Sequence, residues 1–153
     1  MNVNPSGQVV LGLGSLNGDD QFGWCVIDAL LRSPIAVELH KIRHPIDILF
    51  WLDLASHVHV VDAAIGLPEH VCLWRLEGAN PEHRNQIQML PSHGTHDWGL
   101  STTYRMAQSL GKPIERVTLW LGRAEAFQPQ MAIGVDTQTA LDVCLETLRK
   151  QLG

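Results

Sequence analysis

The stretch Gln8–Gly23 reads QVVLGLGSLNGDDQFG, an apolar run followed by glycines and then by two adjacent acids, Asp19 and Asp20. The apolar run that ends in Gly12 predicts a β-strand, and a helix is expected to follow the glycines. Apolar residues recur beyond the loop at helical spacing, namely at Phe22, Val26, Ile27, Leu30 and Leu31. The stretch therefore predicts a strand, a tight loop and a helix, with two carboxylates where a phosphate-binding loop would carry none.

The composition describes one folded domain that spans residues 1–153. Apolar residues make up 45% and charged residues 18% of the chain, which is typical of a globular protein rather than a disordered one. The net charge of -5 argues against a nucleic-acid partner and against an anionic membrane surface. No signal peptide and no apolar run of about 20 residues is found, so we expect a cytoplasmic protein without a membrane partner.

The cysteines and most of the histidines are expected to have structural or surface roles. Three cysteines stand far apart in the sequence, at Cys25, Cys72 and Cys144, and suggest neither a disulfide framework nor a cysteine metal site. We interpret them as buried apolar residues, with a nucleophilic Cys25 as the alternative. Surface positions are expected for several histidines, namely His57, His59, His70 and His83.

Further strands and helices alternate along the rest of the chain. Strands are expected at 35–42, 57–61, 71–76 and 116–121, and helices at 45–55, 100–110 and 136–152. The polar segment 77–88 is expected to be a surface connection, and a hairpin over 58–76 could add an antiparallel strand. The pattern predicts a three-layer α/β fold of the phosphorylase/hydrolase-like type, with a largely parallel, twisted sheet of about five strands flanked by helices.

Acidic and histidine residues follow the predicted strands at the edge where ligands gather in parallel sheets. Asp19 and Asp20 follow the first strand, Asp62 ends the third, and His93 and His96 precede the helix at 100–110. Two carboxylates and an imidazole suit a borderline divalent ion such as nickel or zinc, and two carboxylates can alternatively activate a water. One of Asp19 and Asp20 could instead cap the following helix, whereas Asp62 follows VHVV and would be costly to bury without a partner.

A nucleotide-binding loop is an alternative that the glycines invite. Gly12 and Gly14 are followed by Gly18, so the dinucleotide fingerprint is off by one residue. The second predicted strand ends in HKIRH at 40–44, without the acid that would bind a ribose, and the two acids of the loop would repel a pyrophosphate. The match to a nucleotide-binding protein is therefore weak.

Nearly the whole chain resembles the nickel-iron hydrogenase maturation proteases. That family has a strand followed by G-x-G and D-[DE]-x-x-G, here Gly12–Gly14 and Asp19–Gly23. It then has a hydrophobic strand that ends in D-A, here Asp62–Ala63, and H-x-x-G-L before a helix, here His96–Leu100. The family's D-G-G segment after the second strand is replaced here by residues 41–47, and Ser15 replaces its usual Asn.

The resemblance implies an aspartic-type endopeptidase that removes the C-terminal peptide of a nickel-loaded hydrogenase large-subunit precursor. It implies that Asp20, Asp62 and His96 recognise nickel, with Asp20 and Asp62 also the catalytic candidates. The nickel belongs to the substrate, so no tightly held cofactor is expected. Asp19, His44 and His93 are possible substrate contacts, and His93 is the alternative to His96 as ligand.

The expected partner is the hydrogenase large-subunit precursor, and the protein is expected to be a monomer. Two other hypotheses stay open beside the endopeptidase. One is a non-proteolytic accessory protein that binds the precursor and senses nickel, and the other is a nucleotide-binding protein. Trp24 and Trp98 stand next to the candidate site and serve either a docking surface for a protein substrate or core packing.

Overall fold

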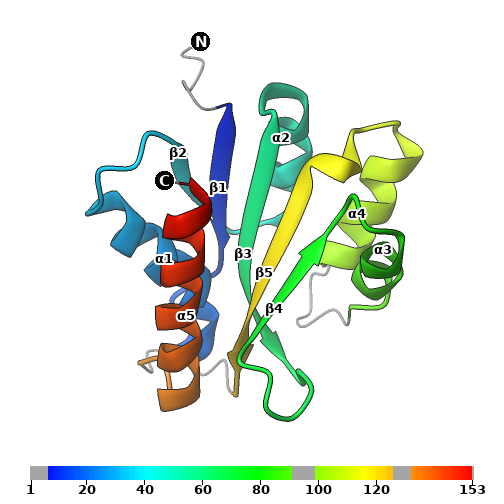
Figure 1. The fold of residues 1–153 in the computed structure, drawn as a ribbon. Coiled ribbons are helices and arrows are strands. Elements are labelled where there is room, and N and C mark those ends of the chain that lie inside the picture. The colour runs from blue at the N-terminus through cyan, green and yellow to red at the C-terminus, as the bar shows by residue number, and fades with distance from the viewer. Residues whose placement is uncertain (1–6, 91–98, 126–131, 153) are drawn as a thin grey trace.

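A five-stranded sheet forms the centre of the computed structural model, which describes residues 7–90, 99–125 and 132–152. The strand order is β2-β1-β3-β5-β4 (Figure 1). Four strands are parallel, and β4 is antiparallel to its neighbour β5. The strands are β1 (Gln8–Leu13), β2 (Glu38–Ile42), β3 (His57–Ile65), β4 (Leu73–Glu77) and β5 (Val117–Ala124).

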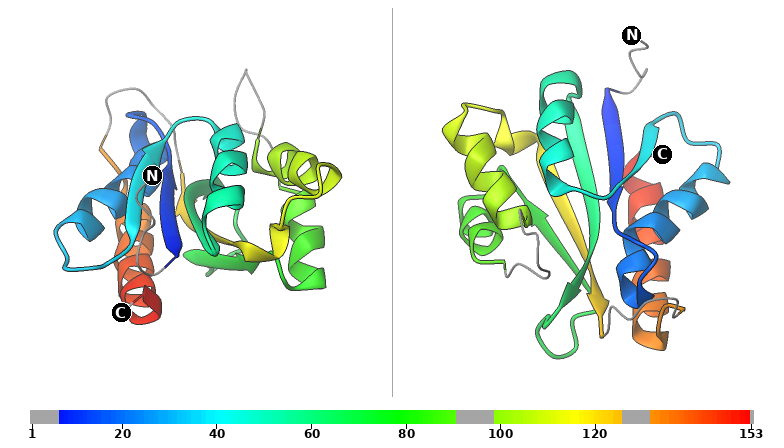
Figure 2. Two further views of the ribbon diagram at one scale, coloured as in Figure 1. Left: turned by 90° about the horizontal axis from the view of Figure 1, so that it is seen from above. Right: turned by 180° about the vertical axis from the view of Figure 1, so that it is seen from behind.

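Helices cover both faces of this sheet, which gives three layers when the molecule is viewed from above (Figure 2). One face carries α1 (Phe22–Leu31) and α5 (Val135–Leu152), and the other carries α2 (Ile48–Leu54), α3 (Pro81–Gln88) and α4 (Leu100–Ser109). Short 3₁₀ turns are η1 (Gly18–Gln21), η2 (Pro45–Asp47) and η3 (Ile114–Arg116). The predicted three-layer α/β fold is confirmed.

The middle strand shows why this sheet must be covered on both faces. Val58 and Val60 of β3 pack in the core under α2, α3 and α4, whereas Val61 and Ala63 pack under α1 and α5. A strand with buried side chains on both faces reads as a nearly continuous apolar run, as in VHVV. No helix in the described ranges is both long and apolar enough to cross a membrane.

The structure differs from the sequence-based predictions in three details. The antiparallel strand was expected to form a hairpin with the third strand, but β4 pairs with β5. The segment 77–88 was expected to be a surface connection, yet it contains α3, whose start is marked by Asn80 and Pro81: the Asn80 side chain accepts hydrogen bonds from the first turn. β3 continues to Ile65, so Asp62 lies inside the strand rather than at its end.

His59 is a further correction, because it is fully buried rather than on the surface. Trp120 donates its indole Nε1–H to His59 Nδ1 at 3.1 Å, and the opposite ring nitrogen lies 3.0 Å from Gln8 Oε1. Since Nδ1 accepts, the ring proton is on Nε2 and is donated to Gln8. Burial, with smaller contributions from the neighbouring His57 and Arg75, lowers the pKa of His59 to about 3.

The four parallel strands all end at one edge of the sheet, at the lower end of Figure 1. β1 ends at Leu13, β2 at Ile42, β3 at Ile65 and β5 at Ala124. The helices α4 and α5 begin at this edge, since each runs opposite to the parallel strands (Figure 1). Loops from distant parts of the sequence therefore meet there, as expected for a ligand site in such a sheet.

Candidate functional site

The turn after β1 folds back on itself and fixes the direction of Asp20. Gly18 has φ +54°, a left-handed conformation that favours glycine, and η1 begins at this residue. The N–H of Ser15 donates to the main-chain oxygen of Asp20 at 3.2 Å, and the Ser15 hydroxyl donates to Asp20 Oδ2 at 2.6 Å. Asp20 is therefore held by its own loop rather than left to rotate.

Gly23 allows this turn to reach the third strand. A Cβ atom at Gly23 would lie 2.6 Å from the main-chain oxygen of Val61 and would also clash with the main-chain oxygen of Leu13. Helix α1 consequently begins in direct backbone contact with β1 and β3. This close approach brings η1, and with it Asp20, onto the strand that carries Asp62.

Asp62 lies on the face of the sheet that α2, α3 and α4 cover, because it alternates with Val61 and shares the face of Val60. The N–H of Ala63 donates to Asp62 Oδ1 at 2.8 Å, and no residue of the described ranges donates to Oδ2. Burial raises the pKa of Asp62 well above its ordinary value, and the negative charge of Asp20 raises it further. Burial also raises the pKa of Asp20, against the lowering effect of the Ser15 hydrogen bond.

The charge of Asp20 reaches Asp62 and raises its pKa, which favours either protonation of one acid or a bound cation. Like charges in close proximity disfavour ionisation of both groups, which is the arrangement of carboxylate pairs that carry out acid–base chemistry. A divalent cation between them would remove the same repulsion. Within the described ranges no group of three or more potential metal-ligating side chains occurs, so a metal at Asp20 and Asp62 would need further ligands from elsewhere.

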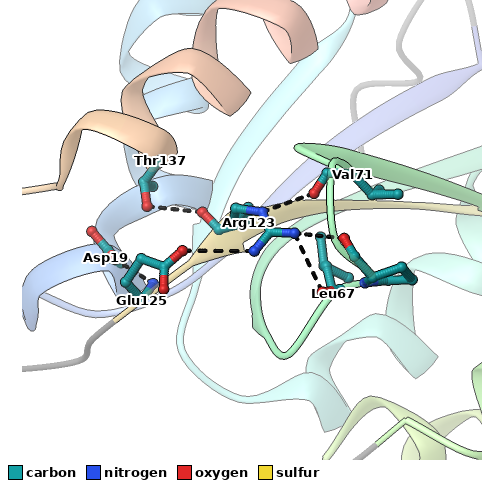
Figure 3. Close-up of polar contacts among 7 residues, drawn as sticks. Asp19, Leu67, Val71, Arg123, Glu125 and Thr137 are labelled. Carbon is teal, nitrogen blue, oxygen red and sulfur yellow. Dashed lines mark hydrogen bonds and ion pairs between the residues drawn. The ribbon is translucent and has the colours of Figure 1, made fainter.

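Asp19 has a different environment from its neighbour. Its side chain is 4% exposed, Oδ2 accepts the N–H of Glu125 at 2.6 Å, and Oδ1 accepts the N–H of Gly134 at 2.7 Å. Figure 3 shows Asp19 beside Glu125 at the end of β5. Neither acid caps α1, whose N-cap is Gln21 without a side-chain bond, because η1 intervenes between the acids and the helix. The N-cap expectation was therefore wrong, while a substrate contact of Asp19 stays a prediction.

Of the three predicted histidines, the structure describes His44 alone. His44 is exposed and follows β2 by two residues. His93 and His96 lie outside the described residues, and α4 begins four positions after His96. The contacts proposed for all three histidines stay predictions.

A second polar network at this edge was missed by sequence reasoning. Arg123 donates to the carbonyls of Val71, Leu67 and Pro68 at 2.9, 3.3 and 2.6 Å, so it fixes the loop between β3 and β4 (Figure 3). Thr137 of α5 donates its hydroxyl to the Arg123 carbonyl at 2.8 Å. An arginine at the end of an apolar strand gives no local sequence signal for carbonyls more than 50 positions away.

Two alternative predictions for this region, a nucleophilic Cys25 and a nucleotide-binding loop, find little support. Burial and the charge of Asp28 raise the pKa of the Cys25 thiol, which is the opposite of what an activated nucleophile needs. In the turn after β1, the N–H groups of Gly14, Ser15 and Asp20 all donate to main-chain oxygens. A phosphate-binding loop would leave such N–H groups for the ligand.

Comparison with solved structures identifies the fold. The hydrogenase maturating endopeptidase HybD from E. coli superposes with a TM-score of 0.71 at 18% identity, over 95% of this chain and 91% of that chain. The [NiFe] hydrogenase maturation protease HybD from Thermococcus kodakarensis gives 0.71 at 14% identity, over 95% and 99%. This chain has the fold of the hydrogenase maturation proteases. The hydrogenase 2 maturation peptidase from a Thaumarchaeota archaeon gives 0.61 at 23% identity, over 95% and 97%.

Sequence-level comparisons add no further relative of the hydrogenase maturation protease fold. No protein-family model matches the chain, and no curated protein matches it either. The resemblance in the motifs around Asp20 and Asp62 is thus joined by a likeness of the whole fold, over nearly the full length of each compared chain.

Proposed function

We propose that this protein is the endopeptidase that removes the C-terminal peptide of a nickel-loaded hydrogenase large-subunit precursor, and so completes maturation of the hydrogenase. The observation that carries the proposal is the pairing of Asp20 with Asp62 at the carboxyl edge of a sheet with the hydrogenase maturation protease fold. The structures with that fold are named for hydrogenase maturation endopeptidases and proteases.

The precursor's nickel is proposed to be recognised by Asp20, Asp62 and His96. Carboxylate and imidazole ligands suit nickel, and two acids within electrostatic reach of one another attract a cation. His96 precedes α4, which covers the face of the sheet that carries Asp62. In this proposal the nickel arrives with the substrate and reports that the hydrogenase metal centre is assembled.

Asp62 is proposed as the general base of an aspartic-type hydrolysis. A carboxyl group with a raised pKa is a stronger base, and Asp62 Oδ2 is the oxygen without a protein donor in the described ranges. Water bonds to the scissile carbonyl carbon as its proton moves to Oδ2. The C–N bond then breaks, and the same proton moves to the leaving amine.

The proposal is tested by the intact mass of the large-subunit precursor from the same organism, loaded with nickel or free of it, after incubation with this protein. Loss of one C-terminal peptide from the nickel-loaded form alone is expected. Asp62→Asn should abolish that loss, whereas Asp28→Asn removes a charge from the exposed surface of α1 and should not. No mass change with either precursor, or cleavage by Asp62→Asn at the wild-type rate, would contradict the proposal.

A mass result also separates the protease from the accessory protein. If the precursor binds tightly but keeps its full mass under every condition, the nickel-sensing accessory protein replaces the endopeptidase. His93→Gln and His96→Gln, compared in the same assay, test which histidine contacts nickel. We expect His96→Gln to abolish cleavage and His93→Gln to retain it.

A further inference from the structure

Trp24 lies against the turn that carries Asp20. The main-chain oxygen of Ile42 accepts both the Trp24 indole N–H and the N–H of Gly14, each at 3.1 Å. A Cβ atom built on Gly14 would lie 2.5 Å from the main-chain oxygen of Asp20 and 3.3 Å from Trp24 Cδ1. Gly14 is therefore enclosed between the backbone of Asp20 and the indole, which places the indole next to the turn that carries Asp20.

Two cations lie against this indole, and they differ in how their charge is balanced. The Lys41 ammonium is 5.7 Å from the ring centre and forms an ion pair with Asp28 at 2.7 Å. The Arg43 guanidinium is 5.2 Å from the ring centre, and Arg43 is exposed. No acidic side chain of residues 7–90, 99–125 or 132–152 forms an ion pair with it. Arg43 is thus an exposed cation on the indole that borders the turn of Asp20, with its charge available to a ligand.

We propose that Arg43, supported by the Trp24 indole, forms an anion subsite that binds a carboxylate of the substrate polypeptide. The inference rests on the proposed function, since it names the part of the precursor that this side of the site binds. The carboxylate is either an acidic side chain of the precursor's C-terminal extension or the terminal carboxylate of that extension.

The chemistry of Arg43 on the Trp24 indole favours a carboxylate over other groups. A guanidinium offers two parallel N–H donors that match both oxygens of a carboxylate, and stacking on an indole holds that planar fork in place. The acids and Arg43 then form a surface with opposite charges at its two ends. Such a surface orients a bound chain, with its cationic group toward Asp20 and Asp62 and its anionic group toward Arg43.

The test measures KM and kcat for cleavage of the nickel-loaded precursor by Arg43→Gln and Arg43→Lys. Arg32→Gln is the matched control, because Arg32 is an exposed arginine just after the end of α1. We expect Arg43→Gln to raise KM about fivefold, with kcat little changed, which is the size of one charge-assisted pair at an exposed site. Arg43→Lys keeps the charge without the two parallel N–H donors, so its KM should lie between those of the wild type and Arg43→Gln. The KM of Arg32→Gln should match that of the wild type.

The source of the carboxylate is found by changing the precursor. Each acidic residue of the C-terminal extension is replaced by its amide in one set of precursors, and the terminal carboxylate is amidated in another. The carboxylate bound by Arg43 is the one whose loss raises KM for the wild type but causes no further rise for Arg43→Gln. If no replacement couples to Arg43→Gln, or if Arg43→Gln behaves as Arg32→Gln does, the subsite is refuted.

A binding measurement distinguishes failure of the anion subsite from failure of the proposed function. If the wild type cleaves no precursor, the endopeptidase fails, and affinity for the nickel-loaded precursor is measured by calorimetry instead. Weaker binding by Arg43→Gln than by Arg32→Gln would then support the anion subsite on a non-proteolytic protein. Equal affinities, or the absence of any binding by the wild type, would overturn it.

Discussion

Acidification is expected to destabilise this protein through His59. The folded protein holds the ring neutral because it is fully buried between Trp120 and Gln8, and its pKa in the folded state is about 3. In the unfolded chain the pKa returns to the ordinary value of a solvated histidine, about 6.5. Between these two values the unfolded chain binds a proton that the folded chain does not bind.

The sign and the size of the effect follow from that difference. Because the folded-state pKa lies below the unfolded one, the contribution to stability is complete above pH 6.5 and is lost as the pH falls. Each pH unit below 6.5 removes about 1.4 kcal/mol, so the free energy of unfolding should fall by about 2 kcal/mol between pH 7.5 and pH 5 on account of His59. That loss is a large part of the stability of an ordinary domain, which is about 5–15 kcal/mol.

The assay is urea unfolding of the wild type and His59→Gln at pH 7.5 and pH 5. His59→Gln is expected to be less stable at pH 7.5, since the hydrogen bonds of the ring to Trp120 and Gln8 are lost, but to lose about 2 kcal/mol less than the wild type on acidification. His70→Gln removes an exposed histidine and should retain the full loss. If His59→Gln and the wild type lose the same free energy between the two pH values, the buried neutral ring is not what limits acid stability.

Three further outcomes are expected at the carboxyl edge of the sheet. Gly23→Ala should lower the free energy of unfolding by about 1–3 kcal/mol, because its Cβ would press on main-chain oxygens of β1 and β3, whereas Gly134→Ala should be nearly neutral; urea unfolding compares them. Asp20→Asn should lower the pKa of Asp62, since the neighbouring charge that helps raise it is removed, and carboxyl carbon NMR titration would show it. Asp19→Asn should lower the free energy of unfolding by about 1–3 kcal/mol, because the amide N–H of the new side chain would face a backbone N–H. An unchanged urea midpoint would contradict the two hydrogen bonds that Asp19 accepts from Glu125 and Gly134.

The local part of the fold could be predicted because its signals are local. The strand at Gln8 and the helix at Phe22 are specified by side-chain periodicity and by the glycines between them. Helix α3 was missed because Ile87 is the one buried side chain among its eight residues, so no periodic apolar stripe marks it. Its start signals, Asn80 followed by Pro81, are present, but without an apolar stripe after them they are equally typical of a loop.

Features that depend on distant partners could not be predicted in the same way. His59 looks like any histidine in a strand, and its burial depends on Trp120, 61 positions away, and on Gln8, 51 positions away. The sequence around β4 likewise does not determine whether β4 pairs with β3 or with β5. The proximity of Asp20 and Asp62 could be predicted, because a general rule places the carboxyl ends of parallel strands together.

The two adjacent acids of the first loop have separate tasks because η1 turns their side chains to different neighbours. Asp19 is buried and joins the turn to the end of β5 and the start of α5 through two backbone N–H groups, while Asp20 faces Ser15 and the charge of Asp62. A phosphate-binding loop would offer its N–H groups at this place, but here those groups donate to main-chain oxygens of the turn and of Ile42, and carboxylates are presented instead. The same strand–glycine–helix backbone that elsewhere receives an anion thereby presents acids, which in the proposed function would meet the positive charge of a nickel-bearing substrate.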